Sequence, residues 1–296
     1  MINSFISRVK KIISRKKNIS NDILRPIDVR LCGNSPFSLS YMSLPRPVVC
    51  DMPLNLGRGF RVLPLELNSY HPFIVALLQA SKATNMLATI RNGLETYYRF
   101  VQPKNPCDWI NIQNSRSGLL QRCKPHALSM PWDLKNPQQW EISREKFVKD
   151  ENLMFKKTLG IEGGFHFWGP VSNVKLEVEA LRLSNIYSSI LNNGYMRDDN
   201  QGSDVRAVVL KKNNCDWRWQ VCGGEHRAAA ALVAGYSVIP VRVIQIVYLD
   251  DVDIWPGVLH GYYSKSEALQ VFGQVFNGIY PFIFQQWIGQ LSKNVF

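Results

Sequence analysis

The sequence is poor in cysteine, and its cysteines do not pair in the patterns that disulfide frameworks or zinc sites use. Six cysteines are scattered over 296 residues without a C-x-x-C pair. This spacing argues against both a disulfide scaffold and a thiolate zinc site, and it fits a reducing compartment. No stretch approaches the roughly 18 apolar residues of a membrane span, and the first residues lack a signal-peptide core. These absences predict a cytoplasmic protein.

Several motifs that would assign a function are also missing. The glycine-rich stretch 159–171 lacks the G-K-[ST] ending of a phosphate-binding P-loop. There is no internal repeat, no low-complexity segment and no convincing helix-turn-helix pattern in the C-terminal part of the chain. Binding to nucleic acid is therefore the least favoured function.

Positive charge is plentiful and unevenly spread. The net charge is +12, and residues 1–30 carry eight Lys or Arg against two Asp. Within residues 1–17 the apolar side chains fall on one helical face and basic side chains cover the rest, which predicts a helix lying on an anionic membrane surface. The protein would then be peripheral on the inner membrane face. A helix that packs on its own protein remains the alternative.

The most informative stretch is 217–243. Residues 217–222 alternate in polarity as a half-buried strand does, and a second strand is expected over 238–247. Between them, Gly223 and Gly224 provide a tight turn, and residues 225–234 form an alanine-rich helix that Gly235 should end. The segment therefore predicts a strand, a glycine turn, a helix and a strand.

A glycine turn before a helix is a generic site for anions, because the first N–H groups of the helix and its dipole both favour negative charge. His226 and Arg227 lie in that first turn, where cations oppose the dipole. An anionic ligand would explain their presence. A purely structural turn is the competing interpretation.

These residues resemble a known superfamily. Gly-Glu-His-Arg at 224–227, the alanine run, Gly235 and Ile-Pro-Val at 239–241 are similar to the ParB/sulfiredoxin fold superfamily, whose members carry a G-x-x-R box at a helix N-terminus. The resemblance covers about residues 165–250. It implies an α+β fold, with a ParB/sulfiredoxin-like mixed domain, a helix-rich N-terminal region and C-terminal helices.

The resemblance also implies a ligand, because relatives place nucleotide phosphates at this box. It implies ATP or CTP with Mg²⁺, held by Gly223, Gly224 and Arg227. Glu225 and His226 are the catalytic candidates, with Glu225 as a possible general base. Sulfiredoxins have a catalytic cysteine where this chain has Glu225, and Cys222 lies three residues earlier, so sulfinic acid repair is not expected.

Further candidates come from the flanking segments. Lys175, Glu179 and Arg182 share one face of a predicted helix, so Lys175 and Arg182 could receive phosphate charge, or the face could be a solvated set of ion pairs. His166 could line the site or pack within a loop. The aspartates at 250, 251 and 253 could hold Mg²⁺ or form a solvated turn.

The sequence thus predicts a basic amphipathic helix at 1–17, an N-terminal region of unassigned role at 18–164, the ParB/sulfiredoxin-like domain at 165–250 and a helical extension at 251–296. The leading functional hypothesis is a nucleotide-dependent phosphotransferase or hydrolase near the cell envelope, with a small-molecule or saccharide acceptor, for example in surface polysaccharide modification. A non-enzymatic nucleotide-sensing or membrane-associated interaction protein and a ParB-type DNA-binding protein are the alternatives.

Overall fold

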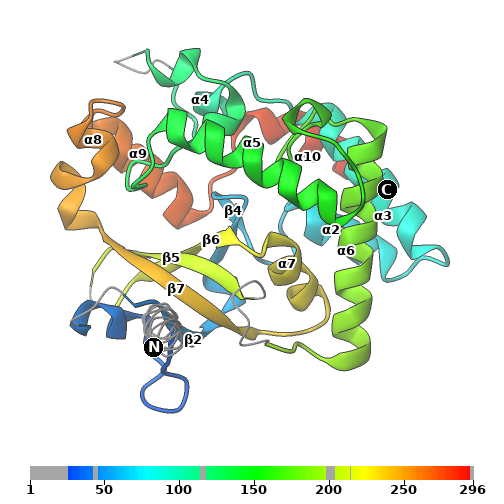
Figure 1. Cartoon of the computed structure of the whole chain (residues 1–296), viewed down its shortest axis with the longest axis horizontal. Helices are drawn as coiled ribbons and strands as arrows, with labels where there is room; N and C mark the ends of the chain where they lie inside the picture. Colours follow the sequence, from blue (N-terminus) through cyan, green and yellow to red (C-terminus); the bar gives the residue numbers. More distant parts are fainter. Residues whose placement is uncertain (1–25, 43–45, 114–117, 198–203, 214, 294–296) are drawn as a thin grey trace, which may run out of the picture.

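A computed structural model describes residues 26–42, 46–113, 118–197, 204–213 and 215–293 (Figure 1). The basic amphipathic helix expected at 1–17 lies outside these residues. The fold mixes helices with one seven-stranded sheet of parallel and antiparallel pairs. Its strands are β1 (Ile27–Asp28), β2 (Val48–Pro53), β3 (Gly57–Gly59), β4 (Leu63–Pro64), β5 (Val205–Lys211), β6 (Trp217–Gly223) and β7 (Val238–Tyr248).

Helices form most of the rest of the described chain. The α-helices are α2 (Pro72–Ala80), α3 (Met86–Phe100), α4 (Pro106–Trp109), α5 (Pro137–Met154), α6 (Asn173–Asn193), α7 (Glu225–Val233), α8 (Pro256–Leu259), α9 (Lys265–Asn277) and α10 (Gln285–Lys293). Short 3-10 turns connect them, including η4 (Pro125–Ala127) and η6 (Leu249–Ile254). In Figure 1, α2, α3, α6 and α7 gather at one end of the sheet, and α5 runs across the molecule above it.

The sheet has the order β1-β2-β7-β5-β6-β3-β4. β5 pairs with β7 in parallel and with β6 as an antiparallel hairpin. Asn213 closes that hairpin, because its Oδ1 accepts from the N–H groups of Cys215 and Asp216 at 3.0 and 2.9 Å. The strand predicted at 217–222 is therefore confirmed as β6, although Gln220 is as fully buried as Trp219 and Val221, so the strand is not half-buried.

Helix α7 is fixed by a glycine at each end and by small side chains between them. Gly224 is its N-cap in the left-handed region (φ 91°), and Gly235 follows the helix at φ 94°. The four alanines 228–231 are fully buried, so the backbone of α7 approaches its neighbours closely. Those neighbours are α6 and α2 together with strands β3 and β5. The junction between β6 and α7 is consequently held in one place.

The N-terminal region contributes directly to the sheet. β2 pairs with β7, and β3 pairs with β6, so strands from residues 48–59 flank the three strands β5, β6 and β7 that lie within 165–250. The boundary expected near residue 165 is therefore not a boundary of the sheet. Strands β2 and β3, from the region of unassigned role at 18–164, thus belong to the same sheet as β5, β6 and β7.

Other expectations from the sequence have clear outcomes. Ser172 caps α6, and Ser264 with Glu267 forms the capping box that begins α9. Trp109 and Trp132 are core residues, whereas Trp140 is only partly buried. Within the described residues, no helix has the length and apolar character needed to cross a bilayer.

Candidate anion-binding site

The turn between β6 and α7 has the geometry that the glycines predicted. At Gly224, φ is 91° and an added Cβ would lie 3.0 Å from Val205 Cα, so a larger residue would be strained, whereas a Cβ on Gly223 would meet only the movable Arg206 guanidinium, 2.7 Å away. The N–H groups of Arg227 and Ala228 bond the Gly224 carbonyl, each at 3.0 Å. The earlier N–H groups, those of Glu225 and His226, precede the first bonds of the helix and suit an anion.

Two arginines lie at this turn. Arg227 is half-buried in the first turn of α7, and Arg206 on β5 is exposed beside Gly223. Neither forms an ion pair with any other residue that the structure describes. A guanidinium at a helix N-terminus is opposed by the helix dipole. Together with the glycine turn, they create a locally positive surface that would favour a phosphate group.

Glu225 points into the protein rather than toward this surface. Its Oε2 accepts from the N–H of Phe60 at 3.1 Å, while its Oε1 is buried without a hydrogen-bond partner among the described residues. Burial raises the pKa of Glu225 to about 8, although the Phe60 N–H and the charge of Arg61 oppose that rise. The side chain is therefore mostly a neutral acid near pH 7, which weakens its expected role as a general base.

His226 also differs from expectation. Its Nε2 lies 2.7 Å from Oε2 of Glu179, and the ring is buried against Phe73. Burial, reinforced by the charge of Arg182, lowers the pKa of His226. A neutral ring that donates from Nε2 to a carboxylate has no exposed charge for a phosphate. The structure thus pairs His226 with Glu179 inside the protein, and its role at a bound phosphate stays a prediction.

Lys175 and Arg182 are likewise engaged elsewhere. Lys175 is fully buried, with its Nζ 2.6 Å from Glu179 Oε1 and 3.0 Å from Asn152 Oδ1, and Arg182 pairs with Glu151. Burial pushes the pKa of Glu179 upward, but the His226 hydrogen bond and the charge of Lys175 hold it well below its usual value. The predicted shared face is present, yet it forms an interior ion-pair network. Both cations are thus paired within the protein, and their contact with phosphate stays a prediction.

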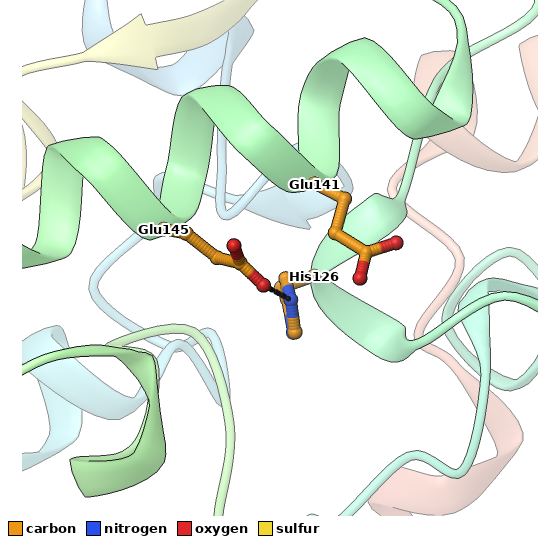
Figure 2. Close-up of side chains that lie close together, drawn as sticks. All are labelled: His126, Glu141 and Glu145. Atoms are coloured by element: carbon orange, nitrogen blue, oxygen red, sulfur yellow. Dashed lines mark hydrogen bonds and ion pairs between the residues drawn. The ribbon is translucent and has the colours of Figure 1, made fainter.

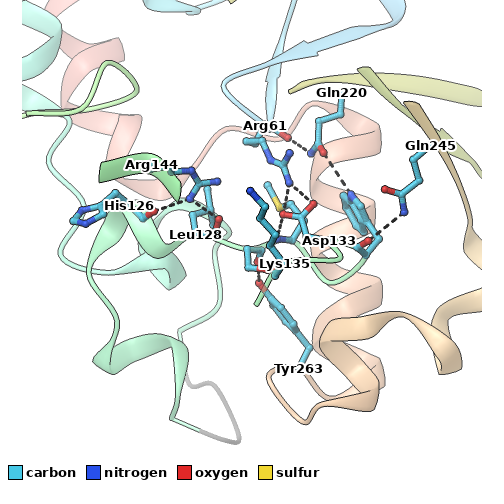
Figure 3. A network of polar contacts seen from close by, with 12 residues as sticks. Arg61, His126, Leu128, Asp133, Lys135, Arg144, Gln220, Gln245 and Tyr263 are labelled. Atoms are coloured by element: carbon cyan, nitrogen blue, oxygen red, sulfur yellow. Dashed lines mark hydrogen bonds and ion pairs between the residues drawn. The ribbon is translucent and has the colours of Figure 1, made fainter. Parts of the chain in front are cut away.

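A second positive cluster, which the sequence did not predict, lies close to Glu225. The turn between β3 and β4 places Phe60 (φ 45°) and Arg61 (φ 73°) in the left-handed region, where non-glycine residues are strained. Arg61 Nη2 contacts both oxygens of Asp133 at 2.5 and 2.6 Å, and its carbonyl accepts from Gln220 at 2.6 Å (Figure 3). These bonds hold Arg61 beside Glu225.

Helix α5 adds Trp140 and Arg144 to this cluster. The Arg144 Cζ lies 4.4 Å from the Trp140 ring centre, the Lys135 Nζ 5.0 Å and the Arg61 Cζ 5.8 Å. Arg144 donates to the carbonyls of His126 and Leu128 at 2.8 and 2.6 Å (Figure 3), and burial together with Arg61 lowers its pKa to about 9. We call Arg61, Asp133, Lys135, Trp140 and Arg144 the cationic cluster.

The cationic cluster has unsatisfied hydrogen-bonding groups. The Nε of Arg61 and the Nε1 of Trp140 are buried and make no hydrogen bond with the described residues. Asp133 and Lys135 also line a cavity of about 190 Å³ that His260 and Tyr262 border. Three cations with one carboxylate and unused donors favour an anionic ligand. No spacing in the sequence connects residues 61, 133, 135, 140 and 144, so only the excess of basic residues signalled them.

The remaining candidates have simpler outcomes. His166 is buried, and its ring packs against Phe60 and Phe165. The aspartates at 250, 251 and 253 are exposed on η6, where Asp253 pairs with Lys265 at 2.8 Å. Among the described residues, the carboxylates near the β6–α7 turn do not offer a ready Mg²⁺ site, because Glu225 is mostly neutral and Asp204 is paired with Arg197 and Arg242. The residues fit phosphate better than they fit a protein-held metal.

Comparisons with family models, with curated proteins and with solved structures give no match. The resemblance to the ParB/sulfiredoxin superfamily therefore rests on the residues quoted for it.

Proposed function

We propose that this protein is a ParB/sulfiredoxin-like nucleotide-binding protein that holds the phosphates of ATP or CTP at the β6–α7 turn. The observation that carries the proposal is the pairing of the Gly223–Gly224 turn with Arg206 and Arg227, which have no acidic partner among the described residues. The helix N–H groups and the two guanidinium groups supply complementary donors for phosphate oxygens. Mg²⁺ would be held mainly by the phosphates themselves.

We propose further that the bound nucleotide is used in phosphoryl transfer or hydrolysis. The cationic cluster lies on the Glu225 side of the same turn, and its positive charge would attract an anionic acceptor such as an acidic saccharide. Glu225, whose carboxyl points into the protein in this structure, would accept the proton of an attacking hydroxyl only if it were ionised and turned toward the bound phosphates. The rate should therefore rise as the pH increases toward about 8, the pKa of this carboxyl. A role near the cell envelope remains part of the proposal.

A nucleotide sensor without catalysis is the second candidate. The observation that favours it is the neutral state of Glu225 near pH 7. A neutral carboxyl cannot act as a general base, and this one accepts a hydrogen bond from the Phe60 N–H. The two candidates share the same binding site. They differ in whether phosphate is released or transferred after binding.

The test is a calorimetric titration of ATP and of CTP, each with Mg²⁺, into the full-length protein. Arg227→Ala and Arg206→Ala should each weaken binding by roughly tenfold or more, because each removes a charge-assisted hydrogen bond to phosphate. Arg99→Ala is the matched control. It removes an exposed arginine on α3, distant in sequence from Arg206 and Arg227, and the variant should bind nucleotide as the wild type does.

The results separate the alternatives. Binding by the intact protein followed by release of phosphate supports the enzyme, and binding without turnover over the whole pH range supports the sensor. If neither nucleotide binds the intact protein, the β6–α7 turn is a structural element and the proposal is wrong.

A further inference from the structure

Three metal-ligating side chains converge where η4 lies against α5. They are His126 on η4 and Glu141 and Glu145 on α5, and one ligand atom from each lies within 4.8 Å of the others (Figure 2). Glu141 and Glu145 are four residues apart, so both project from the same helical face. The imidazole points toward this pair of carboxylates, with its Nε2 3.4 Å from Glu145 Oε1.

A cationic group already lies at this position. The Nζ of Lys124 is 2.8 Å from Glu141 Oε1 and 3.8 Å from Glu145 Oε1. The ammonium group thus occupies the place that a metal ion bridging the carboxylates would take. The Lys124 side chain is 63% exposed, so it can turn into solvent when another cation arrives.

The histidine is suited to metal binding. The His126 side chain is partly buried on η4, and its Nε2 lies 3.4 Å from Glu145 Oε1, on the side where the carboxylates converge. Its backbone is fixed as well, because the His126 carbonyl accepts from Nη1 of the buried Arg144 at 2.8 Å. This bond ties η4 to α5, and a preorganised ligand costs less conformational entropy when it binds.

We propose that His126, Glu141 and Glu145 form a binding site for a divalent transition-metal ion, with Zn²⁺ as the best-fitting ion. One imidazole and two carboxylates form a mixed nitrogen and oxygen set that Zn²⁺ accepts, whereas Mg²⁺ and Ca²⁺ prefer oxygen ligands throughout. Three protein ligands leave a further coordination position for water or for a ligand group. The site would link η4 to α5 beside the cationic cluster.

The experiment is a calorimetric titration of ZnCl₂ into the full-length protein without nucleotide, so its result does not depend on the function proposed above. The wild type should bind one Zn²⁺, and His126→Ala and Glu145→Gln should each lower the affinity by about 10- to 100-fold or more. His260→Ala removes another histidine, whose Nδ1 lies 2.7 Å from the Pro256 carbonyl, and should leave the affinity unchanged. MgCl₂ at the same concentration should give no comparable binding.

Lys124→Ala distinguishes this site from metal bound elsewhere on the protein, because only here does the Lys124 ammonium compete with the metal. Removing the competing ammonium should tighten Zn²⁺ binding and should also increase the rise in unfolding temperature that Zn²⁺ causes. Equal Zn²⁺ affinity in wild type, His126→Ala and Glu145→Gln would place the metal elsewhere, for example on cysteine thiols, and would overturn the proposal. Weaker binding in Lys124→Ala would also overturn it. Glu145 is 40% exposed, so its variant should fold even if His126→Ala does not.

Discussion

Two clusters of charged residues flank the β6–α7 turn, and they differ in how evenly their positive and negative side chains balance. The interior network contains Lys175 and Arg182 against Glu151 and Glu179, with His226 neutral. The cationic cluster has three cations and only Asp133 to balance them. A balanced buried network satisfies itself and holds helices together, whereas an unbalanced one retains binding capacity for a ligand. Charge balance, rather than the number of charged residues, distinguishes the structural cluster from the functional candidate.

The largest effect should come from breaking the balanced network. Glu179→Ala leaves the fully buried Lys175 ammonium without its nearest carboxylate at 2.6 Å, and it removes the partner of His226. Loss of one partner of a buried ion pair costs about 3–5 kcal/mol. Urea unfolding should show this loss of stability. Glu177→Ala, at an exposed position on the same helix, is the control. An equal loss of stability in both variants would show that the buried ion pairs contribute no more than an exposed glutamate does.

A pH experiment sharpens the comparison at Glu225, which lies between the two clusters. Burial raises its pKa in the folded state to about 8 from 4.5, so the folded protein binds more protons between these values. The contribution of Glu225 to stability is therefore complete below about pH 4.5 and is lost as the pH rises to about 8.

Glu225→Gln removes this titration and keeps the size of the side chain. The unfolding free energy of the wild type should fall relative to that of Glu225→Gln as the pH increases through this window, and the difference should become constant above it. Parallel curves for the two proteins between pH 5 and 8 would show that Glu225 is ionised in the folded protein.

Removing a cation from the cationic cluster should cost less stability. Arg144→Met keeps much of the apolar contact with Trp140 but loses the two hydrogen bonds to the His126 and Leu128 carbonyls. We expect a loss of about 2 kcal/mol, measured by urea unfolding. Destabilisation as large as that of Glu179→Ala would mean that the two clusters serve the same structural purpose.

The smallest effect should have the opposite sign. Arg227→Ala removes a cation from the first turn of α7, where the dipole disfavours it, and alanine is a strong helix former. The protein should become more stable by about 0.3–1 kcal/mol while it loses affinity for nucleotide. A thermal unfolding curve without ligand is sufficient to measure this. A clear loss of stability would indicate that Arg227 stabilises the fold through a contact within the protein rather than serving to bind a ligand.

The local pattern of the sequence predicted the local structure well. Strand β6, the turn at Gly223 and Gly224, and the end of α7 at Gly235 follow from the local pattern of residues and from glycine conformations, which act over a few residues. Helical periodicity also places Lys175 and Arg182 on one face, as the structure does. The side of the protein that this face meets was not predictable, because it depends on the packing of Glu151 from another helix.

The missed residues share one property. Arg61 meets Asp133 and Trp140, and His126 meets Glu141, only through the arrangement of separate elements. Strained backbone at Phe60 and Arg61 is also invisible in the sequence, since neither residue is a typical choice for positive φ. Long-range contacts between ordinary residues give no periodic signal.

The pairing of β2 with β7 has a consequence for how the chain reaches its native state. Val48 pairs with Val243, so β2, which is synthesised early, cannot pair with β7 until most of the chain has been synthesised. Contacts between such distant segments slow folding, and until they form β2 and β7 each present an unpaired apolar edge. A fragment limited to residues 165–250 would expose both β7 and β6 edges permanently. We therefore expect that fragment to aggregate, whereas the whole chain protects those edges with its own first strands.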